Sequence, residues 1–497
     1  MGRREAVGTM IRVAMIGAGS IGFTRRMMMD ILAVPELVGT EFRLMDINAE
    51  ALEMSASLCR KMIDDAHLPA TVVATPDRRE ALRDADFVFS FVRVGGLEAF
   101  AHDIEIPLKY GVDQCVGDTL GPGGIFYALR TIPVLVGIAK DMEDVCPRAL
   151  LLNYSNPMAM NCWGVRRASK TPMVGLCHGV QGAHWQIALA LGLPVEEVEF
   201  VAAGLNHQTW FIQVRHKGKD MLPFVLDAFE RNESLAHSEA VRIDVMRRFG
   251  YYSTESNGHL SEYLMWYRKR PQELKSRWIC PDTWIGGRTG GYLEECRKTA
   301  DHYRQMYPKW LSGEADAIRL GDRSSEHGSY IVEALVTGRR YRGHFNVENT
   351  GLITNIPNGC TIEIPCMVDA NGIAPTYIGD LPLGCAAILR QTISVQELTV
   401  EAALTGDKEL VRQALALDPL TGSVCNLDEV WAMADEMLEA LSPWLPQFAE
   451  GRQSPRRAPQ PGLRMTRPIG SPPGSATVDA AGALEKTFAL RGGGDRG

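Results

Sequence analysis

The sequence lacks three features that mark membrane, secreted and zinc-knuckle proteins. No uninterrupted apolar run approaches the roughly 18 residues that a membrane span needs. The basic start of the chain is not followed by the apolar core of a signal peptide. The 11 cysteines include no CxxC pair, which argues against a disulfide framework or a zinc knuckle. We therefore expect a cytoplasmic protein that does not enter a membrane.

Basic charge is also scarce, except at the end of the chain. The net charge is −8, although residues 451–497 contain eight Lys or Arg against three Asp or Glu. The rest of the chain is therefore acidic, which argues against nucleic acid as a partner because nucleic-acid binding depends on basic surface. The Pro-, Gly-, Ser- and Arg-rich segment at 448–497 is predicted to be a disordered tail, with a basic docking arm as the alternative.

A glycine-rich turn near the start of the chain is the most informative feature that is present. The apolar run at 11–16 leads into Gly17-Ala18-Gly19-Ser20-Ile21-Gly22, and a second apolar run at 42–45 ends on Asp46. Glycines allow a tight turn and the close approach of a pyrophosphate, which a helix N-terminus then faces. Asp46 can bind a ribose diol and repels a 2′-phosphate, so the sequence predicts an NAD site rather than an NADP site. An ordinary strand-to-helix turn is the alternative.

Strand and helix patterns alternate through the first 200 residues. Apolar runs typical of strands occupy residues 71–74, 87–92, 149–153 and 173–176. The pattern predicts a doubly wound parallel α/β sheet, in which ligands bind beyond the carboxyl ends of the strands. The residues of interest should therefore follow the strands directly, at 93–96, 154–157 and 177–179.

Two polar pairs stand at predicted strand ends. Cys177 and His178 follow the strand at 173–176, and Asn206 and His207 follow an apolar run at 200–205. A thiolate is a soft metal ligand, and an imidazole binds metals or transfers protons near neutral pH. One of each is too few for a closed structural zinc site but suits an open catalytic site. A small core cysteine is the alternative interpretation.

Several motifs in a fixed order give the chain a family resemblance. From about residue 10 to about residue 447 the chain resembles family 4 of the glycoside hydrolases, and its melibiase-type α-galactosidase branch most of all. The motifs that carry the resemblance are Gly17-Ala18-Gly19-Ser20, the run 118–124 (DTLGPGG), the run 153–161 (NYSNPMAMN), Val174-Gly175-Leu176-Cys177-His178, Gly204-Leu205-Asn206-His207, Thr254-Glu255-Ser256 and Ser261-Glu262-Tyr263.

The resemblance implies a fold, a chemistry and cofactors. It implies a Rossmann-like domain of the lactate/malate dehydrogenase kind, NAD and Mn²⁺ as cofactors, and a small-molecule α-glycoside as substrate. NAD is expected to oxidise the sugar at C3, after which a base removes the proton at C2, the C1 group is eliminated, water adds and the hydride returns. Such a reaction needs no pair of carboxylates across the scissile bond.

The resemblance also assigns roles to single residues. Cys177 and His207 would be the metal ligands, and Asn156 would bind sugar hydroxyls. His178 stands where the phosphoglycosidase branch has an Asp as leaving-group acid, so it is the expected acid, and the change argues for an unphosphorylated sugar. Arg93 and Asp118 are expected to contact sugar or cofactor, with a structural ion pair as the alternative.

The base at C2 is harder to assign. The resemblance points to Tyr263, with Tyr267 and His259 as rivals. Tyr263 and Tyr267 are four residues apart, so we expect them on one face of a helix, where they could also serve packing alone. A free tyrosine is a poor base at neutral pH, so bound cations would have to lower its pKa.

The length of 497 residues favours two domains. We expect an extension at 1–9, with Met10 an equally sensible start, an NAD-binding domain at 10–200, an α+β domain at 201–447 and the tail. The resemblance implies a dimer or a tetramer. The alternatives to an α-galactosidase are an α-glucuronidase or α-galacturonidase, in which Arg93 or Arg323 meets a carboxylate, an NAD-dependent 2-hydroxyacid dehydrogenase, and a non-catalytic NAD-binding protein.

Overall fold

A computed structural model describes residues 10–315 and 321–449 of the chain. The predicted extension at 1–9 and all but the first two residues of the predicted tail lie outside the described residues. Phe448 is buried against the core, so the packed body reaches at least to this residue.

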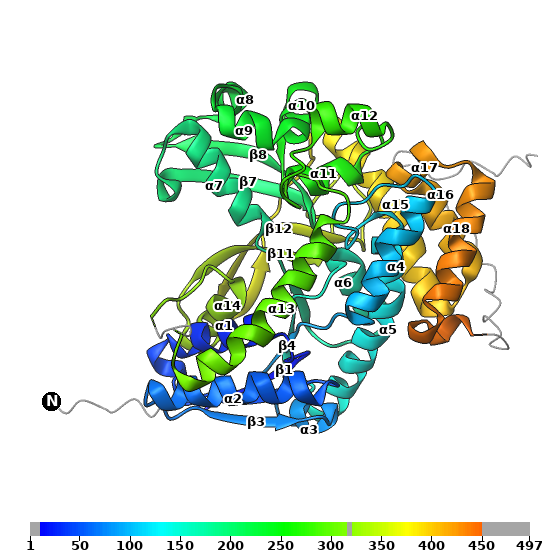
Figure 1. Cartoon of the computed structure of the whole chain (residues 1–497). Coiled ribbons are helices and arrows are strands. Elements are labelled where there is room, and N and C mark those ends of the chain that lie inside the picture. Colours follow the sequence, from blue (N-terminus) through cyan, green and yellow to red (C-terminus); the bar gives the residue numbers. More distant parts are fainter. Residues whose placement is uncertain (1–9, 316–320, 450–497) are drawn as a thin grey trace, which may run out of the picture. The chain divides into compact units, whose positions relative to one another are not determined.

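The strands form one mixed sheet (Figure 1). They are β1 (Arg12–Ile16), β2 (Glu41–Met45), β3 (Thr71–Thr75), β4 (Phe87–Ser90), β5 (Leu150–Asn153), β6 (Met173–Leu176), β7 (Val198–Leu205), β8 (Gln208–His216), β9 (Lys219–Asp220), β10 (Tyr252–Ser253), β11 (Tyr341–Glu348), β12 (Thr361–Asp369) and β13 (Gly372–Pro375).

Helices connect and cover these strands. They are α1 (Ile21–Leu32), α2 (Ala49–Asp65), α3 (Arg78–Leu82), α4 (Gly96–Lys109), α5 (Gly121–Val145), α6 (Met158–Ala168), α7 (Gly179–Leu191), α8 (Leu222–Arg231), α9 (Glu233–Ser238), α10 (Ala240–Phe249), α11 (Asn257–Tyr263), α12 (Pro271–Glu273), α13 (Gly291–Ser312), α14 (His327–Thr337), α15 (Leu383–Thr405), α16 (Lys408–Leu417), α17 (Pro419–Val424) and α18 (Leu427–Ala440).

The first six strands confirm the predicted doubly wound sheet. All their pairings are parallel, and their order across the sheet is β3-β2-β1-β4-β5-β6. This order reverses direction between β1 and β4, which is the place where such sheets bind dinucleotides. Every residue of β4 is buried, as expected for a central strand covered on both faces.

The register brings the carboxyl ends of the strands to one edge of the sheet. Ile16 at the end of β1 is paired with Ser90 at the end of β4, and Ser90 is paired in turn with Asn153 at the end of β5. Asn153 lies opposite Gly175 of β6. The residues that follow these strands, which the sequence pattern singled out, are therefore neighbours in space.

The strands of the second half continue the same sheet. β11 pairs antiparallel with β6, opposite Leu176, and β12, β7, β8 and β10 follow it outward. A sheet with parallel and antiparallel halves, both accompanied by helices, agrees with the expected α/β and α+β halves. The boundary between 200 and 201 stays a prediction, since the sheet runs across it.

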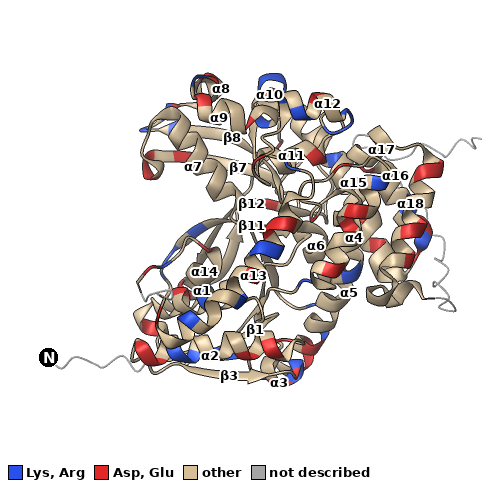
Figure 2. Cartoon of the chain, viewed as in Figure 1, with Lys and Arg blue, Asp and Glu red and all other residues tan. Residues whose placement is uncertain are grey.

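Helix α5 is long and apolar enough to cross a membrane, judged by length and composition alone. Most of this stretch is buried inside the protein, which is typical of a core helix. Charged side chains of both signs occur on α2 and α13 (Figure 2).

Candidate active site

The glycine turn lies where β1, β2 and β4 end together. Gly17 has φ +86° and donates its amide hydrogen to the Met45 carbonyl oxygen at 2.9 Å. A Cβ on Gly17 would stand 2.9 Å from the carbonyl carbon of Phe91, and one on Gly22 would overlap the hydroxyl of Tyr303. Glycine is therefore required at position 17 by close backbone packing and by backbone conformation, whereas at position 22 it leaves room for the Tyr303 side chain.

Asp46 ties the glycine turn to the start of α2. Its Oδ2 accepts a hydrogen bond from the Gly19 amide at 2.8 Å, and its Oδ1 accepts one from the Asn48 amide at 2.8 Å. Asn48 in turn caps α2 by accepting from the Ala51 amide. The carboxylate thus stands at the strand end, as predicted, and each of its oxygens keeps a free lone pair for a ribose hydroxyl.

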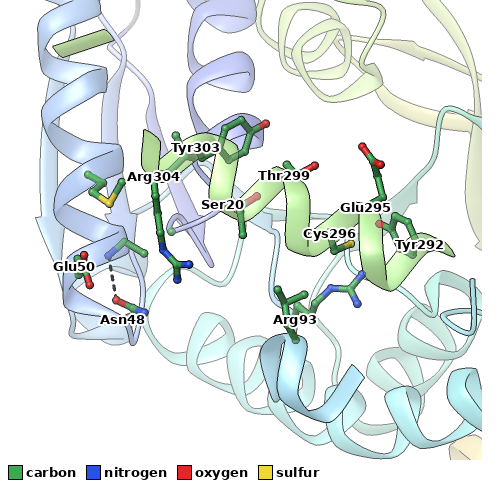
Figure 3. Close-up of a pocket in the computed structure, with 16 residues that line it drawn as sticks. Ser20, Asn48, Glu50, Arg93, Tyr292, Glu295, Cys296, Thr299, Tyr303 and Arg304 are labelled. Atoms are coloured by element: carbon green, nitrogen blue, oxygen red, sulfur yellow. Dashed lines mark hydrogen bonds between the residues drawn. The ribbon is translucent and has the colours of Figure 1, made fainter. Parts of the chain in front are cut away.

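A cavity of about 390 Å³ opens beside this turn (Figure 3). It runs from the start of α2 to Arg93, which follows β4, and one face of α13 forms its other wall. The polar residues that line it are Ser20, Asn48, Glu50, Arg93, Tyr292, Glu295, Cys296, Thr299, Tyr303 and Arg304. Its position at the switch between β1 and β4 suits a dinucleotide.

Arg93 brings a cation to this cavity. Its guanidinium carbon lies 4.6 Å from the ring centre of Phe100, 5.2 Å from that of Tyr127 and 5.6 Å from that of Tyr292. Its Nη1 is buried and has no hydrogen-bond partner within the described residues. Within the described part of the chain, aromatic rings surround Arg93 and no ion pair joins it to Asp118. Such a cation can still meet an anionic group of a ligand.

Three donor atoms converge at the carboxyl end of β6. Cys177 Sγ lies 3.3 Å from His207 Nε2, Glu255 Oε2 lies 3.9 Å from the sulfur, and 3.7 Å separate that oxygen from His207 Nε2. We call these three residues the donor cluster. Ligands of one metal ion, each about 2.0–2.3 Å from it, stand roughly 3–4 Å apart. The cluster therefore fits a divalent ion with little rearrangement, and its mixed donors leave further coordination positions open.

The structure brings together the two predicted ligands, and beside them it places a third candidate donor, Glu255, that the sequence interpretation missed. Glu255 stood in a motif quoted for the family resemblance, without a role. Burial opposes its ionisation, but His207, His259 and His178 around it hold its pKa below the usual value. Burial and the charge of Glu255 raise the pKa of Cys177 well above its usual value, so a cation is needed to make it a thiolate.

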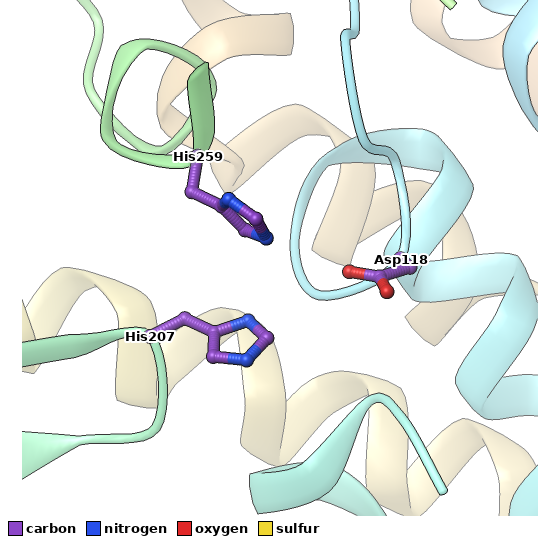
Figure 4. Close-up of side chains that lie close together, drawn as sticks. All are labelled: Asp118, His207 and His259. Atoms are coloured by element: carbon purple, nitrogen blue, oxygen red, sulfur yellow. The ribbon is translucent and has the colours of Figure 1, made fainter. Parts of the chain in front are cut away.

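A second group surrounds the other ring nitrogen of His207. Asp118, His207 and His259 point toward one another from three separate segments (Figure 4), and their ligand atoms lie within 4.8 Å of each other. His207 Nδ1 is 2.8 Å from Thr119 Oγ1, and Thr119 donates to Asp118 Oδ1 at 2.8 Å. Asn156 Nδ2 donates to the other oxygen of Asp118 at 3.0 Å, so these two predicted substrate residues are bonded to each other.

Of the three candidates for the base, two lie at this site. The buried Tyr263 has its hydroxyl 3.5 Å from His207 Nδ1, and the ring centre of His259 is 5.0 Å from that of His207. Burial lowers the pKa of His259 to about 4. Burial also raises the pKa of Tyr263 well above its usual value. Tyr267 instead donates to Asp244 Oδ2 at 3.1 Å.

The expectation that Tyr263 and Tyr267 share a helical face is wrong. Helix α11 ends at Tyr263, and Leu264 is extended, with φ −122° and ψ 137°. The buried Arg268 holds the chain in this path, because it donates to the backbone oxygens of Asp113 at 2.7 Å and Gly287 at 3.0 Å. These contacts with distant segments outweigh the local pattern for a longer helix.

His178 stands beside the donor cluster, at the start of α7, and its side chain is 61% exposed. Its Nδ1 lies 3.4 Å from Glu326 Oε1. The Glu326 carboxylate raises the pKa of His178 to about 9, so the imidazole carries a proton at neutral pH. The arrangement provides a proton donor that is open to a ligand.

The fold and the site define a dinucleotide-binding α/β protein with metal-type donors at the ligand edge of its sheet. Residues 12–193 match the profile of "Family 4 glycosyl hydrolase", and residues 202–421 match that of the "Family 4 glycosyl hydrolase C-terminal domain". The chain belongs to family 4 of the glycosyl hydrolases. The resemblance expected from the motifs is thereby confirmed, and with it the expectation of an enzyme.

Two α-galactosidases are similar over most of the chain. That of Rhizobium meliloti (strain 1021) is 50% identical over 440 residues, or 88% of this chain and 90% of the relative. That of Bacillus subtilis (strain 168) is 36% identical over 442 residues, or 88% of this chain and 100% of the relative. Among solved structures, a 6-phospho-α-glucosidase from gut microorganisms in complex with NAD and Mn²⁺ has a TM-score of 0.70 at 22% identity, covering 89% of this chain and 100% of that chain. This last likeness shows the fold.

Proposed function

We propose that the protein hydrolyses α-galactosides with bound NAD and a divalent ion, Mn²⁺. The observation that carries the proposal is the convergence of Cys177 Sγ and His207 Nε2 to 3.3 Å, next to the hydroxyl of Tyr263. The similarity to two α-galactosidases supports the substrate class. The membership in family 4 favours this reaction over that of a 2-hydroxyacid dehydrogenase and over a non-catalytic role.

NAD would occupy the cavity beside the glycine turn. The segment Gly17 to Gly22 would approach the pyrophosphate, with Ser20 at the start of α1, and Asp46 would bind the ribose hydroxyls. Arg93 Nη1 has no hydrogen-bond partner among the described residues, so it could donate to an anionic or polar group of NAD at the Arg93 end of the cavity. The carboxylate of Asp46 disfavours a 2′-phosphate and so favours NAD over NADP.

Cys177 and His207 would hold the metal ion, with Glu255 as a third ligand. When bound, such an ion supplies Lewis-acid stabilisation of negative charge on neighbouring oxygens of the sugar. Tyr263 would take the C2 proton through its hydroxyl oxygen, and its buried position excludes water from that transfer. His178 would donate its proton to the leaving group at C1.

The sugar would be held by Asn156 and Asp118. The amide of Asn156 keeps its oxygen free to accept from a hydroxyl, while its nitrogen donates to Asp118. His178 in place of an acidic residue supports an unphosphorylated sugar. Arg323 forms an ion pair with Glu333 and stacks on Tyr330, but its Nη2, like the Nη1 of Arg93, is buried without a hydrogen-bond partner among the described residues. The preference for the α-galactoside over the uronides is therefore supported by the similarity to two α-galactosidases and not by these arginines.

The test is a panel of nitrophenyl α-galactoside, α-glucoside and α-glucuronide, each assayed with NAD and Mn²⁺ and again with a chelator. We expect turnover of the galactoside that is lost without metal or without NAD, and deuterium at C2 of the product in heavy water. Turnover that survives removal of both NAD and metal would overturn the proposal. Preference for the glucuronide would contradict the proposed α-galactoside substrate but would agree with the proposed NAD- and metal-dependent mechanism.

We also propose that the protein works in the cytoplasm as a dimer or tetramer. The lack of a CxxC pair and the eleven free cysteines of the structure support a reducing compartment. The two proposed functional parts, 10–200 for NAD and 201–447 for the base, agree with the two matched family regions.

Light scattering of the purified chain measures the assembly state. A monomer at all concentrations would contradict the proposed dimer or tetramer.

A further inference from the structure

Thr119 connects His207 to Asp118 beneath the donor cluster. Its hydroxyl oxygen is 2.8 Å from His207 Nδ1 and 2.8 Å from Asp118 Oδ1. All three side chains are buried, with exposed fractions of 4% for Thr119, 2% for Asp118 and 5% for His207. Thr119 contacts Nδ1 of the imidazole, whereas Cys177 Sγ faces Nε2. The two contacts therefore lie on opposite sides of the ring.

The number of hydrogens decides the direction of these two bonds. A threonine hydroxyl has one hydrogen to donate, and an ionised carboxylate can only accept. The hydrogen of Thr119 is therefore used on Asp118, and the hydroxyl can meet His207 only as an acceptor. Nδ1 of His207 must then carry the hydrogen. The hydroxyl of Tyr263 is more distant from this nitrogen, at 3.5 Å.

In the neutral imidazole this assignment leaves the lone pair of His207 on Nε2, the nitrogen that faces the donor cluster. Nε2 lies 3.3 Å from Cys177 Sγ and 3.7 Å from Glu255 Oε2. His207 itself lies in the tight turn between β7 and β8, with φ +63°, an unusual value for a residue other than glycine. The contact between Nδ1 and Thr119 holds the ring from the side opposite the donor cluster.

We propose that Thr119 is a positioning residue that, braced by Asp118, fixes the Nε2 lone-pair tautomer and the orientation of His207 and so prepares the donor cluster for a divalent ion. The inference rests on the proposed function for the identity of the ion. Hydrogen bonds from the second nitrogen of a ligand histidine commonly set its tautomer, and their loss weakens metal binding about 10- to 100-fold. Asn156, which donates to Asp118, completes the chain of contacts.

Two substitutions separate the hydroxyl from the packing of Thr119. Thr119→Val keeps the branched shape and removes the hydroxyl, whereas Thr119→Ser keeps the hydroxyl and removes the methyl group. Free Mn²⁺ is measured by electron paramagnetic resonance during titration of the full chain, without NAD or sugar. We expect the dissociation constant to rise about 10- to 100-fold in Thr119→Val and to stay close to wild type in Thr119→Ser.

NAD affinity and the thermal midpoint, measured on the same samples, control for folding. A purely structural role would lower the thermal midpoint of Thr119→Val without changing Mn²⁺ affinity, and that result would overturn the inference. Wild-type protein that binds no Mn²⁺ would instead overturn the proposed metal site, whatever the variants do.

A second measurement does not depend on any variant folding well. Nitrogen-15 resonances of labelled histidines in the metal-free wild-type protein distinguish the two imidazole tautomers, and the signal of His207 is assigned by its loss in His207→Gln. We expect hydrogen on Nδ1. Hydrogen on Nε2, whether Nδ1 is bare or also carries hydrogen, would overturn the inference directly.

Discussion

Two hydroxyl groups near His207 Nδ1 have different surroundings, and this difference separates their roles. The hydroxyl of Thr119 donates to Asp118, while that of Tyr263 lies 3.5 Å from His207 Nδ1 and also meets the Thr119 hydroxyl. Burial keeps Tyr263 neutral in the free protein by raising its pKa. A nearby positive charge lowers the pKa of a phenol, so Tyr263, the proposed base, would accept a proton only when the metal ion and the coenzyme are bound.

Tyr263→Phe should reduce kcat by about 10²- to 10⁴-fold, the usual contribution of a general base. The ring keeps its packing, so Mn²⁺ and NAD affinities should remain near wild type. The matched control is Tyr267→Phe, which removes a hydroxyl that donates to Asp244, outside the site. Turnover and deuterium uptake at C2 are measured for both variants. An unchanged rate in Tyr263→Phe would transfer the role of base to His259.

At this scale the motifs predicted Cys177, His207 and Tyr263 at one site, because their order along the chain resembles that of a known family. Glu255 and Thr119 were not predicted as their partners. The contacts join residues 78 positions apart for Cys177 and Glu255, and 88 apart for Thr119 and His207. Such proximity depends on the sheet register, which no local pattern contains.

Helix α13 forms a wall of the cavity that the sequence pattern around the glycine turn does not predict. The glycine turn was predicted from strand, spacing and acid, but α13 lies about 270 residues later and forms the opposite wall. Its Tyr303 packs with Ile21 and Leu58 over the start of α1, and its Tyr292 stacks near Arg93. The coenzyme cavity is thus shared between the two family regions.

Gly22→Ala should weaken NAD binding because its methyl group overlaps the Tyr303 hydroxyl and forces this cavity-lining side chain to move. Overpacking of this kind costs about 1–3 kcal/mol, and 1.4 kcal/mol corresponds to about tenfold in affinity. Adding Tyr303→Phe removes the overlapping oxygen and should restore most of the affinity. NAD titrations by calorimetry compare both variants with Tyr303→Phe alone. Equal weakening in the single and double variants would contradict the role given to Tyr303.

For the whole molecule, the fold class was predictable and the single continuous sheet was not. Alternating apolar runs gave the strands of the parallel half, whose order then follows the usual rules for such sheets. The second half was expected as a separate α+β unit, yet β11 pairs directly with β6. That pairing joins Phe345 to Leu176, and an antiparallel contact between such distant segments has no signature in either one.

The joined sheet also buries a histidine whose titration should limit stability at low pH. His344 on β11 stacks on Phe200, and its Nε2 has no partner among the described residues. Burial, followed by the charges of Arg342, His327 and His184, lowers the pKa of His344 well below 6.5. The unfolded chain therefore binds a proton that the folded chain excludes, and this contribution to stability is lost as the pH falls below about 6.5.

One such proton changes the free energy of unfolding by about 1.4 kcal/mol per pH unit. His344→Phe keeps the aromatic stack and cannot titrate. Between about pH 6 and about pH 4.5, the free energy of unfolding of this variant should therefore fall less steeply than that of wild type, by about 1.4 kcal/mol per pH unit. The exposed His237→Gln is the matched control and should follow the wild-type curve. Urea unfolding of the metal-free proteins at several pH values measures all three slopes. Parallel curves for wild type and His344→Phe would mean that the folded sheet already admits the proton at His344.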